Sequence, residues 1–185
     1  MKSIASILLC LIILTSCGRV NYEKQATDFY QAMNASSLSQ LELLYSDSVR
    51  IGNDGEFITY SFEEYQHWLS WDSTFHPTYK VLEIEMREDF AEVTISKECN
   101  RILYLNGEPT VYKEKLTFKD KRIQSVESTE LILFNTEKWV SRRDTLVDWI
   151  AENEPKLDGF IFDQTKQGAI NYLKAIELYE AKIMK

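Results

Sequence analysis

The order of apolar and polar residues predicts helices in the first part of the chain. Between residues 22 and 34, apolar side chains recur every three or four positions, which is the spacing of one helix face. Capping-box patterns, a serine followed three residues later by Gln or Glu, then predict a second helix over 38–45 and an aromatic-rich third helix over 62–75.

The middle of the chain has period two, which is typical of half-buried strands. A short hairpin is expected where 49–51 and 57–60 flank the turn signal Asn53-Asp54-Gly55. From residue 82 onward apolar residues alternate with charged ones, and Asn106-Gly107 is a strong hairpin signal. We therefore expect an antiparallel sheet with further strands over 82–86, 91–95, 102–105, 111–118 and 122–134.

Helical spacing returns in the tail, over 141–153 and 164–185, with Asp163 as the expected N-cap of the last helix. The loop 155–162 joins them, and we expect its apolar end to pack against the sheet or the terminal helix. Docking on its own domain is the default expectation for that helix. Dimerisation and recognition of another envelope protein are the alternatives.

A short apolar leader precedes these elements. The apolar run from Ile4 to Leu14 has the length of a signal-peptide core rather than of a spanning helix. It ends in Leu14-Thr15-Ser16-Cys17, which resembles the lipobox of bacterial lipoproteins at every position. The resemblance implies removal of residues 1–16 and acylation of Cys17. Each buried methylene contributes about 0.8 kcal/mol, so two or three acyl chains would hold the protein on a membrane.

The expected location is therefore the bacterial cell envelope. By the same resemblance, Gly18 after the cysteine favours the outer membrane, facing the periplasm. A secretory leader with an accidental cysteine and an uncleaved anchor are the alternatives. We expect four parts: a signal peptide (1–16), a lipidated cysteine with a short tether (17–21), a folded domain (22–138) and a C-terminal helical extension (139–185).

The charge and composition of the chain reduce the classes of partner and ligand that it is expected to bind. The chain has 29 acidic and 21 basic side chains and a formal net charge of −8, which argues against nucleic-acid binding. If Cys10 leaves with the leader and Cys17 is acylated, Cys99 is the remaining thiol, and we expect it to be a buried apolar residue. With His67 and His76 as the two histidines, neither a metal site nor a cofactor is expected.

The element order over residues 22–135 resembles the nuclear transport factor 2-like, or SnoaL-like, domain. Locally the resemblance rests on Leu44-Tyr45-Ser46-Asp47-Ser48-Val49 at a helix-to-strand junction, on 61–71 as a third helix, and on 118–123 before the last strand. It implies a cone-shaped α+β fold whose N-terminal helices pack on a curved antiparallel sheet, with a pocket at the open end. Members use that pocket for isomerisation, dehydration, cyclisation, ligand binding or subunit contact, so the fold does not determine function.

Aromatic side chains on segments that would line such a pocket are candidate ligand contacts, because small-molecule sites combine apolar walls with a few polar groups. Core packing is the alternative for each of them. These candidates are Tyr60, Tyr65, Trp68, Trp71 and Tyr104.

Asp47 is the candidate base for an enzymatic alternative. Apolar surroundings would raise its pKa toward neutrality, and the hydroxyl of Tyr30 or Tyr65 would hold a developing enolate. A turn or cap role is the competing interpretation of Asp47. His67 is a second candidate for proton transfer, although its place four residues after Glu63 favours a surface ion pair.

The chain lacks a nucleophile-elbow sequence, a phosphate-binding loop and a paired-histidine zinc motif. The leading hypothesis is therefore a membrane-anchored envelope lipoprotein whose cone-shaped domain binds a small apolar ligand or a protein partner without catalysis. The alternative is a lyase or isomerase that uses a pocket carboxylate and a tyrosine. A second copy of the chain is a further candidate partner.

Overall fold

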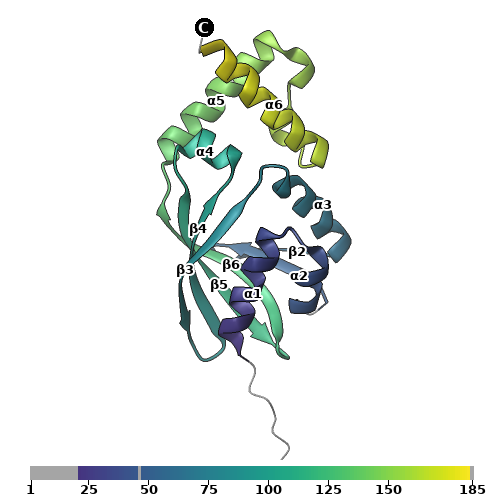
Figure 1. The fold of residues 1–185 in the computed structure, drawn as a ribbon, viewed down its shortest axis with the longest axis vertical. Coiled ribbons are helices and arrows are strands. Elements are labelled where there is room, and N and C mark those ends of the chain that lie inside the picture. The colour runs from purple at the N-terminus through teal and green to yellow at the C-terminus, as the bar shows by residue number, and fades with distance from the viewer. Residues whose placement is uncertain (1–20, 46, 184–185) are drawn as a thin grey trace, which may run out of the picture.

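The computed structural model describes residues 21–45 and 47–183. Pairs of consecutive strands are separated by helices along the chain, in an α+β arrangement (Figure 1). The elements are α1 (Tyr22–Asn34), α2 (Leu38–Leu44), β1 (Val49–Asn53), β2 (Glu56–Tyr60), α3 (Phe62–Ser73), β3 (Thr78–Met86), β4 (Phe90–Glu98), α4 (Asn100–Asn106), β5 (Thr110–Lys119), β6 (Arg122–Leu133), α5 (Thr136–Asn153), the 3-10 turns η1 (Pro155–Leu157) and η2 (Phe160–Phe162), and α6 (Lys166–Ile183).

The six strands form one curved sheet in the order β2-β1-β6-β5-β4-β3. Neighbouring strands run antiparallel, except that β1 pairs with β6 in parallel, so the expectation of an antiparallel sheet holds for most of it. Irregular register between β5 and β6 at three places marks bulges, which bend strands and increase their twist. The sheet thereby curves around α1 (Figure 1).

Two tight turns of two residues each join neighbouring strands of the sheet. Asp54 and Gly55 join β1 to β2 with φ of 50° and 86°, and Asp120 and Lys121 join β5 to β6 with φ of 50° and 66°. Positive φ at both central residues is the requirement of the two-residue turn whose twist matches the flanking strands. The predicted hairpin around Asn53-Asp54-Gly55 is confirmed.

The first hydrophobic core lies between the helices and the concave face of the sheet. Phe29, Tyr30 and Met33 follow one another along one face of α1 and are buried there. Their packing partners on the sheet include Ile95 of β4 and Leu116 of β5, both fully buried. The period-three and period-four pattern that predicts α1 thus corresponds to its sheet-facing side.

The prediction of a strand over 102–105 is wrong, because these residues belong to α4. The Sγ of Cys99 accepts a hydrogen bond from the Ile102 amide at 3.4 Å, and Gly107 ends the helix at φ 87°. Asn-Gly predicts a hairpin because glycine tolerates positive φ, and the same property makes glycine a helix C-cap. A four-residue apolar run has no clear period, so packing of Ile102 and Leu105 against α5 and α6 decided the conformation.

The C-terminal helices form a second hydrophobic core at one end of the sheet. Leu146 and Ile150 of α5 and Tyr172 of α6 pack there with Phe75, which follows α3. Phe160 of η2 lies edge-on to Tyr172 at 4.8 Å between ring centroids, so the apolar loop does pack against the terminal helix as expected. The structure thereby confirms that this helix docks on its own chain.

Both tail helices begin at places that differ from the predicted ones. Asn135 caps α5, which therefore starts five residues earlier than expected. At α6 the Thr165 hydroxyl accepts a hydrogen bond from the Gly168 amide at 3.1 Å, whereas Asp163 accepts one from the Thr165 amide at 2.9 Å. Asp163 thus shapes the turn before the helix, and Thr165 takes the predicted N-cap role.

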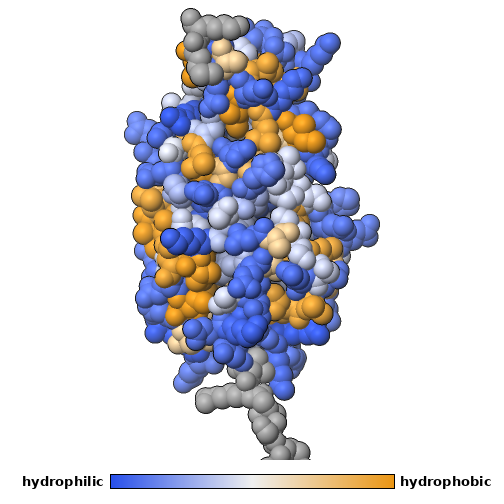
Figure 2. All heavy atoms as spheres, in the orientation of Figure 1, coloured by the Kyte–Doolittle hydropathy of each residue, from blue (hydrophilic) through white to orange (hydrophobic). Residues whose placement is uncertain are grey.

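The start of α1 and the pair α5–α6 lie at opposite ends of the molecule (Figure 1). The leader and Cys17 lie outside the described residues. None of the helices within residues 21–45 and 47–183 combines the length and apolar character needed to cross a membrane. On the face drawn in Figure 2, apolar side chains form separate patches among hydrophilic ones.

Candidate functional site

Polar side chains interrupt the apolar concave face of the sheet. Along β4, Ala91, Val93 and Ile95 are buried against the helices, and Lys97 continues the same alternation. On β5, Glu114 is paired across the strands with Val93 and therefore projects from the same face. The strand geometry thus places an ammonium and a carboxyl inside the fold.

The ammonium of Lys97 is held by a carboxylate from α3. Lys97 Nζ lies 2.9 Å and 3.2 Å from the two carboxylate oxygens of Asp72, a residue that is only 1% exposed. The hydroxyl of Tyr79 on β3 donates a hydrogen bond to Asp72 Oδ2 at 2.9 Å. Lys97 Nζ also lies 4.7 Å from the Tyr79 ring centroid, within cation–π distance. Asp72 is therefore charge-balanced by one neighbour and hydrogen-bonded by another.

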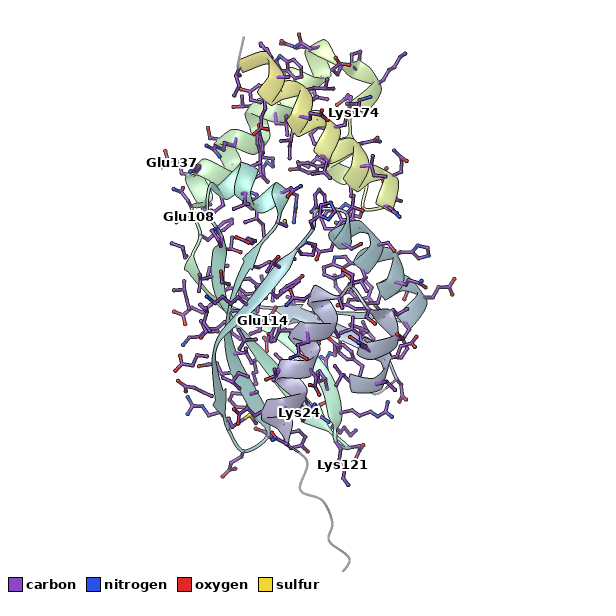
Figure 3. The ribbon with its side chains drawn as sticks, viewed as in Figure 1. Lys24, Glu108, Glu114, Lys121, Glu137 and Lys174 are labelled. Carbon is purple, nitrogen blue, oxygen red and sulfur yellow. The ribbon has the colours of Figure 1, made fainter. Side chains whose placement is uncertain are left out.

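Glu114 forms a second arrangement beside the first. Its Oε2 accepts a hydrogen bond from the Tyr30 hydroxyl at 2.6 Å, and its Oε1 accepts a long one from Ser128 at 3.5 Å. Burial raises the pKa of Glu114, and the bonds from Tyr30 and Ser128 and the charge of Lys97 offset part of that rise. Figure 3 shows Glu114 in the middle of the molecule, beside α1.

We name these residues the inner polar cluster. They come from six different elements, and Glu114 remains partly accessible although it projects inward. The cluster consists of Tyr30, Asp72, Tyr79, Lys97, Glu114 and Ser128.

Aromatic rings surround the inner polar cluster. Tyr65 stacks on Trp68 with ring centroids 5.3 Å apart, and Tyr60 lies 6.2 Å from Tyr65. Within the cluster the rings of Tyr30 and Tyr79 are 6.3 Å apart. Burial raises the pKa of Tyr30, Tyr65 and Tyr79, so their hydroxyls stay neutral. Aromatic rings with few polar groups among them are a composition typical of small-molecule sites.

The hydroxyl of Tyr45 is a polar group without a partner in this region. Tyr45 is fully buried, and its hydroxyl makes no hydrogen bond to any residue that the structure describes. Burial raises the pKa of Tyr45, and the nearby Tyr65 and Glu114 raise it further. An unsatisfied buried hydroxyl costs about 1–3 kcal/mol, so a group that bonded it would bind favourably.

The structure separates the five candidate ligand contacts. Tyr60, Tyr65 and Trp68 lie together beside the inner polar cluster. Trp71 belongs to the second core, 5.0 Å from the Phe75 ring. Tyr104 lies on α4, where it lines an open groove of about 720 Å³ with residues of α5 and α6.

The acid–base candidates are corrected by the structure. Asp47 and His67 are both exposed, so neither has the apolar surroundings that the catalytic hypothesis requires. Within the described ranges His67 forms no ion pair with Glu63 either. Glu114 has those surroundings instead, and Tyr30 is its hydroxyl partner. Glu114 and Lys97 are not among the residues predicted from the sequence. The alternation along the strands could have indicated them, because Glu114 alternates in step with Tyr112, Leu116 and Phe118, and Lys97 alternates in step with Val93 and Ile95.

Cys99 is buried and carries no disulfide, as the sequence predicts. Burial raises the pKa of its thiol, which keeps it protonated and unreactive. Among residues 21–45 and 47–183, no group of three or more His, Cys, Asp or Glu side chains is arranged to hold a metal ion.

Comparisons with known proteins identify the fold. No protein-family model matches the chain, and neither does any curated protein sequence. Among solved structures, IdmH of Streptomyces antibioticus, described as a putative polyketide cyclase, has a TM-score of 0.50 and 13% identity, covering 66% of this chain and 97% of that one.

Two other solved structures are similar at lower scores. A Cytophaga hutchinsonii protein described as NTF2-like and of unknown function has a TM-score of 0.47 and 10% identity, covering 60% of this chain and 89% of that one. A putative polyketide cyclase of Sinorhizobium meliloti has a TM-score of 0.48 and 16% identity, covering 57% of this chain and 93% of that one. The chain has the nuclear transport factor 2-like α+β fold, with the C-terminal helices in addition.

Replacing Lys97 by methionine is expected to destabilise the fold by about 3–5 kcal/mol, because it leaves the Asp72 carboxylate buried without a counter-charge. Chemical unfolding measures this loss. Adding Asp72→Asn to Lys97→Met should recover part of it, whereas Lys113→Met, at a half-exposed ion pair on the outer face, should cost much less. Equal losses at Lys97 and Lys113 would contradict a buried ion pair.

The raised pKa of Glu114 predicts a pH dependence of stability. The folded state keeps a proton that the unfolded chain releases near pH 4.3, roughly the pKa of an unperturbed glutamate. Stability contributed at this site is therefore lost as pH rises from that value through the higher folded pKa. Relative to wild type, Glu114→Gln should gain stability with increasing pH when urea unfolding is followed from pH 4 to 8. Glu92→Gln, on the outer face of β4, is the control, and the same trend in both variants would refute the assignment.

Proposed function

We propose that the cone-shaped domain binds a small, largely apolar molecule against the inner polar cluster. The observation that carries this proposal is the Glu114–Tyr30 pair, a 2.6 Å hydrogen bond set among aromatic rings on the inner face of the sheet yet still partly accessible. Buried polar groups cost free energy unless they are paired, so their concentration at one point favours a role in recognition.

We also propose that Cys17 anchors this domain to a bacterial membrane through its acyl chains. The lipobox Leu14-Thr15-Ser16-Cys17 supports the anchor. An attachment just before Tyr22 would put the C-terminal helices at the end of the molecule away from the membrane (Figure 1). Attachment to the outer membrane on the periplasmic side remains part of this proposal.

Acid–base catalysis is the second candidate function, and it is favoured by the same pair. A carboxyl whose pKa is raised by burial is a stronger base than an ordinary glutamate, and a neutral tyrosine hydroxyl can stabilise an enolate. IdmH is described as a putative polyketide cyclase, and ring-forming chemistry of that kind would fit a carboxyl and hydroxyl held together. Binding without catalysis requires fewer assumptions and is the conclusion we favour.

Native mass spectrometry of the full-length protein, purified from its own host, tests the binding proposal. We expect a mass above that of the denatured, acylated chain, because a molecule remains in the domain. Trp68→Ala should lose this extra mass by removing an aromatic wall. Tyr104→Ala, which alters an aromatic residue on α4, should retain it. Absence of extra mass in wild type, or equal retention by both variants, would refute binding at the cluster.

The same molecule decides between binding and catalysis. If it is returned to purified protein and converted by wild type but not by Glu114→Gln, while both proteins bind it, the domain is an enzyme. If both proteins bind it and leave it unchanged, the non-catalytic proposal holds.

Metabolic labelling with palmitate tests the anchor. Wild type and Cys10→Ser should be labelled and fractionate with membranes, whereas Cys17→Ser should be unlabelled and keep its leader. Labelling of Cys17→Ser would mean that the lipid is attached elsewhere, and an unlabelled wild type would remove the lipoprotein proposal altogether.

A further inference from the structure

The inner polar cluster contains two carboxyl groups and one ammonium group, and this imbalance identifies a class of ligand. We propose that the molecule bound here carries an ammonium group, which binds beside Glu114 with its apolar body against the aromatic rings. This inference rests on the proposed ligand site and specifies its chemistry.

The chain itself contains a complete ammonium site next to Glu114. Lys97 Nζ bonds both oxygens of Asp72, the Tyr79 hydroxyl donates to the same carboxylate, and the Tyr79 ring faces the ammonium. A carboxylate and an aromatic face thus hold this cation inside the fold, and a tyrosine hydroxyl donates to the same carboxylate.

Glu114 likewise accepts a hydrogen bond from a tyrosine hydroxyl, but no cation is hydrogen-bonded to it among the described residues. The Tyr30 hydroxyl donates to its carboxyl as Tyr79 does to Asp72, and the Tyr30 and Tyr79 rings lie side by side at 6.3 Å. Ser128 supplies the other hydrogen bond, and it is neutral. Lys97 lowers the pKa of Glu114 from a distance, but its hydrogen bonds go to Asp72. Of the two arrangements, the one around Glu114 lacks a directly bonded counter-ion.

The elements packed around Glu114 supply no second cation among the residues described. The ionisable groups whose charges act in this region are the tyrosines of α1, α3, β3 and β5, Tyr45 after α2, Asp72 of α3 and Lys97 of β4. The tyrosines are neutral, so ionisation of Glu114 leaves one uncompensated negative charge. A buried charge of this kind is costly, and a cationic ligand would remove the cost.

Tyr45 gives an independent indication of a missing hydrogen-bonding partner. Its hydroxyl is fully buried and unpaired within the described part of the chain, and it lies close enough to Glu114 for that carboxylate to raise the pKa of Tyr45. A hydroxyl oxygen accepts hydrogen bonds, and an ammonium has three N–H groups to donate. An ammonium near Glu114 would leave N–H groups to satisfy Tyr45.

Three probes of similar size distinguish this proposal from the alternatives. Phenylethylammonium, 2-phenylethanol and phenylacetate share an aromatic ring and differ in the charge of the end group. Each is titrated into the full-length protein by calorimetry at a pH where Glu114 is ionised. The pKa of Glu114 is followed in parallel by carbon NMR of its carboxyl group, with and without each probe.

We expect phenylethylammonium to bind about tenfold or more tightly than the alcohol, because the ammonium neutralises the charge of the ionised Glu114 carboxylate whereas the alcohol donates a hydrogen bond without a charge. Binding of phenylethylammonium should lower the pKa of Glu114. Its affinity should therefore increase as pH rises through the pKa that Glu114 has in the protein without probe. Glu114→Gln should abolish the preference, whereas Glu92→Gln should keep it. The NMR measurement uses wild type alone, so it does not depend on the folding of the variant.

Equal binding of the ammonium and the alcohol, or a preference that persists in Glu114→Gln, would overturn the ammonium proposal and leave the ligand site intact. Failure of all three probes to bind at millimolar concentration would also overturn it, since an uncompensated carboxylate beside aromatic rings should hold the simplest such cation. Whether the domain binds a molecule from its own host is tested separately, by the native mass spectrometry described above.

Discussion

The buried ion pair between Asp72 and Lys97 holds helix α3, which contributes to both hydrophobic cores, against the sheet. Helix α3 contributes Tyr65 and Leu69 to the core under the sheet, and Trp71, near its end, packs with Phe75 in the core formed with the C-terminal helices. Asp72 lies between these groups and is bonded to β4 through Lys97 and to β3 through Tyr79. A carboxylate with 1% exposure is tolerated only with such partners, so α3 has one position against the sheet.

The Asp72–Lys97 pair also determines which partners remain for Glu114 on the inner face of the sheet. With Asp72 satisfied by Lys97, the neighbouring Glu114 has only the hydroxyls of Tyr30 and Ser128, in surroundings that raise its pKa. The same fold therefore contains a carboxylate paired with a buried ammonium and a second carboxyl whose hydrogen-bond partners are neutral. The proposals of ligand binding, acid–base chemistry and ammonium recognition all depend on this difference between the carboxyl groups of Asp72 and Glu114.

Much of the fold follows from local pattern. The α1 stripe, the turns at Asp54-Gly55 and Asp120-Lys121, and the alternation along β4 and β5 each depend on residues close in sequence. The prediction failed at 102–105, where a short apolar run before Asn-Gly fits a strand and a helix equally well. Burial of Ile102 and Leu105 against α5 and α6 decided the outcome, and those helices lie more than thirty residues further along the chain.

In the candidate site, too, some features follow from the local sequence and others only from tertiary packing. The sequence by itself determined the mostly antiparallel sheet, the buried Cys99 and the aromatic group of Tyr60, Tyr65 and Trp68. It also contained the period-two alternation that places Lys97 and Glu114 on the inner face of the sheet. Tertiary structure alone decided that Asp47 is exposed, that Tyr30 reaches Glu114 across 84 positions of the chain, and that Lys97 pairs with Asp72 rather than with Glu114. Periodicity reports which face of an element a side chain occupies, whereas the partner across that face is set by how separate elements pack.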